Sequence, residues 1–285
     1  MNQIYLTGFS DEICEDFDKQ LQVVSKFGLK YIEIRGVDGK NIAVLSDEER
    51  QAVKEKLDKY GVSISAIGSP IGKIGIEKDF EPHFEQFKNV IETAKFLNTK
   101  YIRMFSFYIP QEEPAEKYQD AVMKRLSCFV EYAKQKDVVL LHENEKGIYG
   151  DTAERCAEIC EKFHGENFKA VFDFANFVEC GVDTKKAYAL LKPYIAYIHI
   201  KDALKKEKAI VPAGDGDGNV AEILVDLKAE KYSGFLSIEP HLVNFSGLQA
   251  LEYEAKERSG GMDPETAWAL ALRSLKSILW DIDWR

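Results

Sequence analysis

Four polar side chains able to bind a divalent cation stand at matching places in the second half of the chain. They lie at or near the ends of the apolar segments VVLLHE, KAVFD, YIAYIHI and LSIE, as Glu143, Asp173, His199 and Glu239. Three carboxylates brought together without a counter-ion repel one another, so some would have to take up a proton. Three carboxylates and one imidazole suit Mn²⁺, Mg²⁺, Co²⁺ or Zn²⁺. The residue types therefore predict a site for one divalent metal ion, manganese among the candidates.

The prediction of a metal site depends on all four residues facing the same way. A lone acid at a strand end is more often a cap, and a lone histidine is more often a core residue. Side chains alternate along a strand, so each ligand shares a face with the residue two positions earlier. The shared faces pair Leu141 with Glu143, Val171 with Asp173, Tyr197 with His199, and Ser237 with Glu239.

A second set of residues is cationic and falls near the same strand ends. It consists of Arg35, Lys73, Arg103, Lys146 and Lys201. One interpretation is charge balance, for example between Arg103 and either Glu33 or Glu143. The other is that these cations hold a phosphate or carboxylate of the substrate, since the arginine fork matches both groups. We expect Arg35, Lys73, Arg103 and Lys201 to contact the substrate, together with Glu145, Asn176 and His241.

The elements that would position these residues are strands and helices in strict alternation. The predicted strands are Ile4–Gly8, Lys30–Arg35, Val62–Ile67, Lys100–Phe105, Val138–Glu143, Lys169–Asp173, Ile195–Ile200 and Phe235–Glu239. The predicted helices are Asp16–Phe27, Asp47–Tyr60, Phe80–Leu97, Ala115–Lys136, Thr152–Phe163, Asp183–Leu191, Val220–Ala229 and Pro264–Trp280. Eight such units favour an α/β fold, a (β/α)₈ TIM barrel whose strand ends form one mouth. A doubly wound open sheet is the alternative, disfavoured because no glycine-rich first turn is present.

No break in composition divides residues 1–285, so we expect a single domain. The long irregular stretch 240–263 contains Gly260 and Gly261, and it suggests a lid or an interface loop. The sequence does not fix the oligomeric state, and a homo-oligomer is compatible with it.

Charge and cysteine content exclude several classes of protein. Lysine and arginine number 38 against 48 acids, a net charge of −10, which is unsuited to binding nucleic acid or an anionic membrane. No apolar run is long enough to span a bilayer, and the amino terminus lacks the pattern of an export signal. Five cysteines, an odd and low number, indicate a reducing compartment, and we expect a cytoplasmic protein.

Other motifs are set aside. The GDGDG segment at 214–218 follows a loop rather than a strand, and its acids would repel pyrophosphate, so we interpret it as a turn before the next helix. Cys156 and Cys160 have helical spacing and are interpreted as packing. His83, His142 and His164 are expected to lie away from the mouth.

Taken together, LLHENE, VFDFAN, YIHIKDA with the following PAGDGDG, and LSIEPH resemble the xylose isomerase-like TIM barrels of the sugar isomerase and epimerase superfamily. The resemblance spans nearly the whole chain. It implies that Glu143, Asp173, His199 and Glu239 bind one divalent metal, and that Glu143 and Glu239 are also the acid–base pair. Ketose epimerases of that group usually carry a histidine where this chain has Asn176, which argues against simple ketose epimerisation.

These observations predict a metal-dependent isomerase or epimerase of carbohydrate metabolism. It would act on a small sugar or sugar acid, phosphorylated or not, by proton transfer through a metal-stabilised enediolate. A dehydratase of the inosose dehydratase type is the nearest alternative, because the same enediolate can expel a β-hydroxyl. An endonuclease of the apurinic-site type is disfavoured by five histidines and the acidic charge. A non-catalytic sugar-binding protein is the third alternative.

Overall fold

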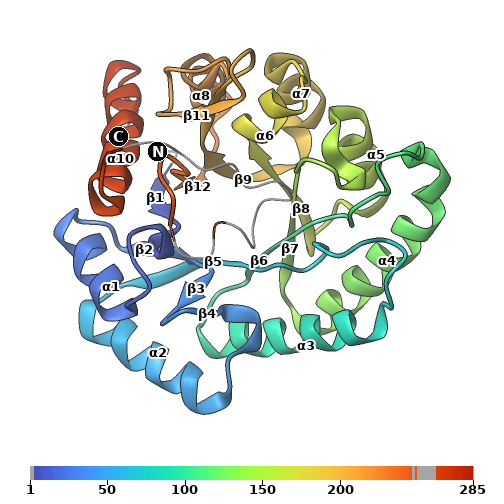
Figure 1. The fold of residues 1–285 in the computed structure, drawn as a ribbon, viewed down its shortest axis with the longest axis horizontal. Helices are drawn as coiled ribbons and strands as arrows, with labels where there is room; N and C mark the ends of the chain where they lie inside the picture. Colours follow the sequence, from blue (N-terminus) through green and yellow to red (C-terminus); the bar gives the residue numbers. More distant parts are fainter. Residues whose placement is uncertain (1–2, 246–247, 249–260, 285) are drawn as a thin grey trace.

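A barrel of eight parallel strands inside a ring of helices forms the centre of the computed structural model, which describes residues 3–245, 248 and 261–284 (Figure 1). Its strands are β1 (Ile4–Gly8), β2 (Tyr31–Ile34), β5 (Ser63–Gly68), β6 (Tyr101–Met104), β7 (Val139–Glu143), β8 (Phe168–Asp173), β9 (Ile195–Ile200) and β12 (Gly234–Ile238). They pair in the order β1-β12-β9-β8-β7-β6-β5-β2, and a parallel bridge between Phe9 and Glu33 joins the two ends. The predicted TIM barrel is confirmed, and the open-sheet alternative is wrong.

The helices surround the barrel as the sequence predicts, within a few residues at each end. They are α1 (Phe17–Lys26), α2 (Asp47–Tyr60), α3 (Glu81–Phe96), α4 (Gln119–Lys136), α5 (Ala153–Phe163), α7 (Thr184–Leu191), α8 (Val220–Ala229) and α10 (Pro264–Asp281). Local signals fix their ends. Ser46 and Glu49 form a capping box at the start of α2, and Gly61 ends that helix with a φ of 62°.

Several short elements are not predicted by the sequence. They are the helix α6 (Phe174–Glu179), the hairpins β3/β4 (Gly36–Val37 and Lys40–Asn41) and β10/β11 (Asp202–Leu204 and Ala209–Val211), and the 3₁₀ turns η1 (Ser10–Glu12), η2 (Ile42–Val44), η4 (Tyr149–Asp151) and η5 (Lys192–Tyr194), whereas the 3₁₀ turn η3 (Ala115–Tyr118) forms the start of the helix predicted at Ala115–Lys136. Each is too short to display a helical or strand period. Three of them, η1, α6 and β10, lie beside the barrel mouth and matter for the site below.

The inside of the barrel is filled by a separate apolar cluster. Ala66, Leu141, Val171 and Tyr197 are buried there, with Tyr101, Val139 and Phe235 packed against them. These residues lie on the inward face that alternation predicts, so the polar residues two positions further along the same strands face the carboxyl end of the barrel.

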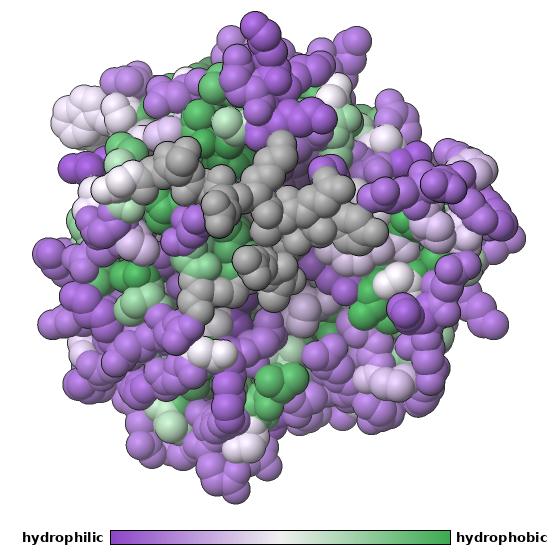
Figure 2. Space-filling view, viewed as in Figure 1, coloured by the Kyte–Doolittle hydropathy of each residue, from purple (hydrophilic) through white to green (hydrophobic). Residues whose placement is uncertain are grey.

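The face of the molecule seen in Figure 2 is largely hydrophilic, with hydrophobic residues in small separate patches. None of the helices in the described residues is long and apolar enough to cross a membrane. The loop predicted as a lid or interface at 240–263 falls mostly on residues 246–247 and 249–260, which lie outside the described residues.

Candidate metal and active site

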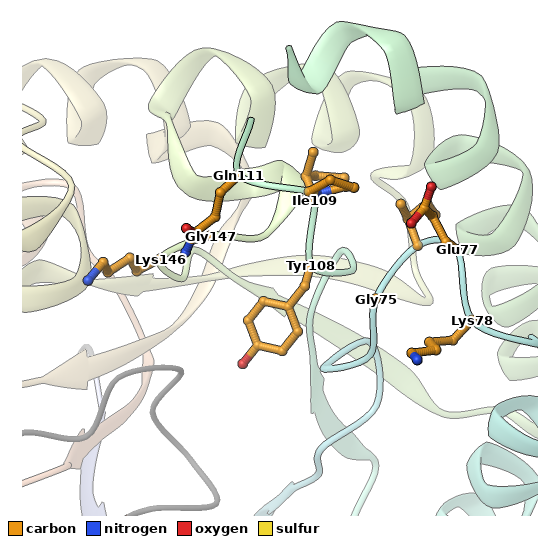
Figure 3. Close-up of a pocket in the computed structure, with 10 residues that line it drawn as sticks. Gly75, Glu77, Lys78, Tyr108, Ile109, Gln111, Lys146 and Gly147 are labelled. Atoms are coloured by element: carbon orange, nitrogen blue, oxygen red, sulfur yellow. The ribbon is translucent and has the colours of Figure 1, made fainter. Parts of the chain in front are cut away.

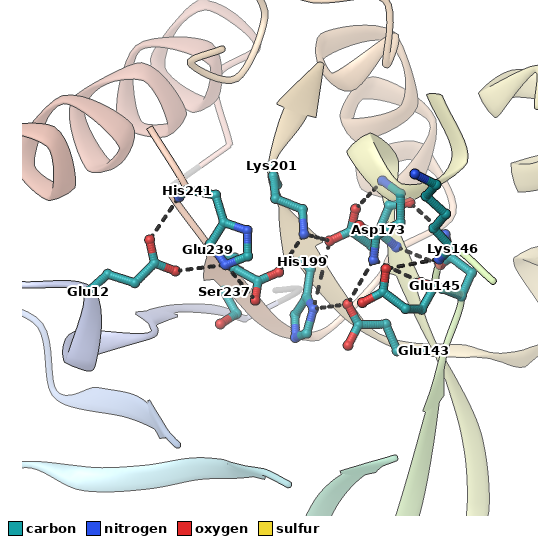
Figure 4. A network of polar contacts seen from close by, with 12 residues as sticks. Glu12, Glu143, Glu145, Lys146, Asp173, His199, Lys201, Ser237, Glu239 and His241 are labelled. Atoms are coloured by element: carbon teal, nitrogen blue, oxygen red, sulfur yellow. Dashed lines mark hydrogen bonds and ion pairs between the residues drawn. The ribbon is translucent and has the colours of Figure 1, made fainter. Parts of the chain in front are cut away.

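The four predicted metal ligands meet at the mouth of the barrel (Figure 4). Glu143 ends β7, Asp173 ends β8, His199 lies in β9, and Glu239 directly follows β12. Each offers one ligand atom, and these atoms all lie within 4.8 Å of one another. All four residues are at most 4% exposed. Asp173 and His199 are partners across the β8–β9 ladder, so strand register alone brings them together.

Arg103 and Lys201 lie directly against these ligands. Arg103 Nη1 is 3.1 Å from Glu143 Oε2. Lys201 Nζ is 2.7 Å from Glu239 Oε2 and 3.3 Å from Asp173 Oδ2. Charge balance suggests either Glu33 or Glu143 as the partner of Arg103, and in the structure Arg103 pairs with Glu143.

Arg35 balances the negative charge of the acids on the other side of the mouth. Its Nη1 lies 2.9 Å from Glu239 Oε1, and the guanidinium also contacts Asp11 at 2.8 Å and Glu12 at 3.3 Å. The His241 backbone N–H donates to Glu12 at 2.8 Å, and its ring Nε2 lies 3.4 Å from both Glu12 and Glu239. This contact holds His241 at a φ of 45°, an uncommon conformation for a residue with a side chain.

Burial and neighbouring charges set the ionisation of the ligands. Burial disfavours the charged form of Glu143, yet His199 and Arg103 lower its pKa to about 2. Burial raises the pKa of Asp173 to about 7, Lys201 opposes the rise, and the charges of Glu143 and Glu239 add to it. Burial opposes protonation of His199, but Glu33 and Glu143 raise its pKa well above the ordinary value. Without a cation, this cluster therefore retains protons that a metal ion would displace.

The donor set fits a divalent cation. Asp173 Oδ2 and Glu143 Oε2 are buried and lie in ion pairs with Lys201 and Arg103, but neither accepts a well-formed hydrogen bond, so both oxygens have lone pairs that a metal ion could take. Among the described residues, the connected ion pairs contain more acids than lysines and arginines, and protons on His199 and His241 supply further positive charge. The acids are Asp11, Glu12, Glu33, Glu143, Asp173 and Glu239, and the lysines and arginines are Arg35, Arg103 and Lys201. A divalent ion would offset most of this excess.

A second group, Glu12, Glu239 and His241, also meets the geometric requirement for binding a metal. There, however, the Arg35 guanidinium already contacts both carboxylates. A further cation would have to lie beside that positive charge. Of the two groups, the one that contains His199 is therefore the better candidate for a metal site.

All seven residues predicted to contact substrate line one cavity of about 30 Å³. They are Arg35, Lys73, Arg103, Glu145, Asn176, Lys201 and His241, joined by Glu143, Glu239 and the unpredicted Glu179. Lys73 and Glu145 pair across the cavity at 2.7 Å. Asn176 lies in α6, where Asp173 caps its backbone N–H at 2.8 Å, and its side-chain amide donates to Glu143 Oε1 at 3.3 Å.

Three further residues support the site and are not among the predicted site residues, although the sequence analysis considers Glu33 as an ion-pair partner of Arg103. Glu33 faces inward and contacts His199, Glu12 lies in η1, and Asn144 clamps the backbone of Asp173 through two hydrogen bonds of 3.0 Å. Asn144 follows Glu143 directly and Glu12 follows β1, so polarity at strand ends is the signal that could have identified both.

The residues set aside earlier lie elsewhere, as predicted. His142 stacks on Phe168 outside the barrel, and His83 accepts a hydrogen bond from the Gly72 backbone at 2.7 Å. Neither metal-competent group among the described residues contains a cysteine. The GDGDG segment is a turn before α8, in which Gly214, Gly216 and Gly218 donate their backbone N–H groups to the buried carboxylate of Asp202.

A larger cavity of about 380 Å³ lies between the loops that follow β5, β6 and β7 (Figure 3). Its lining includes Tyr108, Lys78 and Lys146. The same β5 and β7 loops carry Lys73 and Glu145, so this cavity lies beside the mouth.

A model of the xylose isomerase-like TIM barrel family matches residues 21–278. Among curated proteins, the chain is 22% identical over 186 residues to a 3-dehydroshikimate dehydratase of Bacillus anthracis, covering 65% of this chain and 66% of that relative. It is 25% identical over 244 residues to an inosose isomerase of Halalkalibacterium halodurans, covering 82% of this chain and 86% of the relative.

Solved structures share the fold at low identity. A zinc-bound IolI protein superposes with a TM-score of 0.75 at 20% identity, covering 99% of both chains. A D-allulose 3-epimerase from Methylomonas sp., in complex with D-allulose, reaches 0.75 at 15% identity and covers 97% of this chain and 98% of its own. A magnesium complex of a xylose isomerase-like protein from Mycobacterium smegmatis reaches 0.68 at 17% identity, with 98% of each chain covered.

Proposed function

Because this chain belongs to the xylose isomerase-like TIM barrel family, we propose that it is a divalent-metal-dependent isomerase or epimerase of a small sugar or sugar acid, phosphorylated or not. The observation that carries the proposal is the buried group of three carboxylates and one imidazole within 4.8 Å. A relative named as an isomerase, a structural neighbour named as an epimerase, and neighbours holding zinc or magnesium support it.

Glu143, Asp173, His199 and Glu239 would hold the cation. When bound, it would supply a Lewis acid beside the substrate carbonyl, worth several kcal/mol in stabilising developing negative charge. Glu143 and Glu239 come from positions separated by two strands, β8 and β9, so they approach the mouth from different sides. Burial opposes ionisation of both, but the neighbouring cations lower both pKa values, so each is a carboxylate able to accept a proton. One would remove the proton as a carboxylate, and the other, after taking a proton from solvent, would donate it to the carbon; exchange with solvent would then restore both groups. Such acid–base assistance is worth about 10² to 10⁴ in rate.

The seven polar residues around the 30 Å³ cavity would orient the substrate. Arg35, Arg103 and Lys201 supply positive charge there, which suits a substrate carrying a carboxylate or phosphate. The five cysteines are free, consistent with our expectation of a cytoplasmic enzyme.

The test is a screen of sugars, sugar acids and sugar phosphates with added Mn²⁺, followed by NMR in D₂O. The expected result is solvent deuterium at one carbon of the product, with an unchanged molecular formula apart from the isotope. If no bound sugar takes up deuterium from the solvent, the result would contradict the proposal and indicate a non-catalytic sugar-binding protein.

Glu239→Gln tests the proton-transfer role. It is expected to lower turnover by about 10² to 10⁴ while the folded protein still binds metal, because the amide cannot accept the proton. Glu222→Gln removes an exposed carboxylate on α8 and serves as the matched control. Full turnover by Glu239→Gln would contradict the assigned role.

A dehydratase is the second candidate. The 3-dehydroshikimate dehydratase among the curated relatives favours it, as does Asn176 at the position where ketose epimerases usually carry a histidine. Both reactions begin with proton removal, so the residues proposed above would serve either one. Product mass distinguishes them, because a dehydratase releases one water per turnover.

A further inference from the structure

The imidazole of His199 is held between two carboxylates inside the barrel. Its Nδ1 lies 2.9 Å from Glu143 Oε1, on the side of the metal-competent group. Its Nε2 lies on the opposite side, 3.0 Å from Glu33 Oε2 and 3.2 Å from Glu33 Oε1. All three residues are at most 1% exposed, so bulk solvent does not reach either nitrogen.

Glu33 is itself fixed. Ser237 Oγ donates to Glu33 Oε2 at 2.7 Å, and the Glu33 backbone forms the bridge to Phe9 that joins β1 and β2. Among the ion pairs of the described residues, Glu33 has His199 as its cationic partner and neither a lysine nor an arginine. A carboxylate accepts hydrogen bonds, so without a metal ion His199 carries a proton on each nitrogen, Nε2–H toward Glu33 and Nδ1–H toward Glu143. A metal ion bound between His199 and Glu143 would displace the proton on Nδ1 and leave the one on Nε2.

We propose that Glu33 is a positioning residue, which keeps the proton on His199 Nε2 and thereby presents Nδ1 as the ligand atom for the metal. The inference rests on the proposed function, because the metal is the one assigned there. A ligating histidine typically donates its second N–H to a carboxylate, which fixes the tautomer, orients the ring and makes the ligating nitrogen more basic. Loss of such a partner lowers metal affinity by roughly 10- to 100-fold.

Affinity for Zn²⁺, measured by chelator competition at fixed pH, tests this role in the Glu33→Gln variant. The amide keeps the shape and can still accept from Nε2–H, but it lacks the negative charge. Glu12→Gln is the matched control, because it removes a buried carboxylate from the same mouth without touching His199. We expect Glu33→Gln to lose roughly 10-fold or more in affinity, and Glu12→Gln clearly less. Equal losses would overturn the inference and leave only a general effect of charge.

A second measurement uses the unmodified protein and so does not depend on the variant folding. Imidazole ¹⁵N NMR of the zinc complex should show a protonated Nε2 and a metal-bound Nδ1 for His199. The metal-free protein should also carry the Nε2 proton. Zinc on Nε2, or a metal-free His199 without that proton, would overturn the inference.

Neither measurement depends on turnover, so the two proposals can fail separately. A protein that binds zinc through Nδ1 and converts no substrate would contradict the proposed function and keep the role of Glu33. A wild-type protein that binds no divalent cation would contradict the proposed function and, with it, the assignment of Nδ1 as a ligand atom.

Discussion

At the scale of single residues, the polar groups around the mouth are held mainly by one another. Arg103 and Lys201 contact three of the four proposed ligands, and both are at most 5% exposed. Arg103 also lies against the Phe105 ring, with 4.5 Å between its guanidinium carbon and the ring centre. A guanidinium packed in this way loses little conformational entropy on binding an anion.

Arg103→Gln should therefore weaken binding of anionic substrates. We expect KM to rise roughly 10- to 100-fold for a substrate with a carboxylate or phosphate, because a hydrogen bond to a charged group is worth about 1.5–3 kcal/mol. Neutral sugars of the same size are the comparison. An equal rise in KM for both would show that Arg103 acts only through Glu143.

His83 should make stability depend on pH. Burial lowers its pKa from 6.5 to about 4, and its Nε2 accepts the Gly72 backbone N–H. Below pH 6.5, the unfolded chain takes up a proton that the folded imidazole does not. The free energy of unfolding should therefore fall between pH 6.5 and 4, by up to about 3 kcal/mol.

The measurement is urea unfolding across this pH range for the wild type and His83→Gln. Glutamine can still accept the Gly72 hydrogen bond but does not titrate, so the variant should show the shallower loss. Identical slopes would rule out the assigned contribution of His83.

At the scale of elements, a short loop after β9 is organised by one buried carboxylate. Asp202 accepts hydrogen bonds from the backbone N–H groups of Ala203, Gly214, Gly216 and Gly218, at 2.9–3.1 Å. Asp202 follows Lys201, so the same loop helps to hold the lysine that contacts Asp173 and Glu239. This arrangement explains the glycines of GDGDG without any role in phosphate binding.

Gly216→Ala should disrupt this loop. A methyl group there would lie 2.4 Å from Asp202 Oδ1 and 2.6 Å from the Ala203 carbonyl oxygen, distances at which the backbone must shift. The expected cost is about 1–3 kcal/mol in unfolding free energy. Gly165→Ala is the control, since the nearest atom to its methyl group lies 3.9 Å away. A Gly216→Ala protein as stable as the control would refute this account of the loop.

At the scale of the whole molecule, the first and last barrel strands are neighbours. β1 pairs with β12 along its whole length, from Ile4 with Gly234 to Gly8 with Ile238. The mouth contains residues that follow each of these two strands, Asp11 and Glu12 after β1 and Glu239 after β12. We therefore propose that the chain folds as one domain and that barrel closure and site assembly occur together.

Metal binding should then stabilise the entire fold. An ion that binds only the folded state at 100 times its Kd adds about 2.7 kcal/mol, which for a chain of this length corresponds to a rise in Tm of roughly 4–5 °C. Calorimetry with Mn²⁺ or Zn²⁺ and then with EDTA measures the shift. Asp173→Asn keeps an oxygen to cap α6 but lowers the ligand charge, so its shift should be much smaller. An unchanged shift in that variant would place the ion elsewhere.

The sequence alone determined the barrel and which strand ends are polar, because strand and helix periods are local properties of neighbouring residues. For the same reason, Glu143, Asp173 and His199 could each be assigned to the inward face of its own strand, because the side chains of a strand alternate between its two faces whatever the neighbouring strands are. The sequence did not predict helix α6, because its six residues are too few to show a helical period. Its N-cap is Asp173, a residue that the pattern assigns to a strand.

Only the tertiary structure decided which charged side chains form ion pairs with one another. Glu33 contacts His199 across 166 positions of chain, and Arg35 contacts Glu239 across 204. Arg103 could equally have neutralised Glu33, and nothing within either strand selects between the two acids. The choice follows from how the strands are staggered and how the ring closes between β1 and β2, and those are properties of the assembled barrel rather than of any segment.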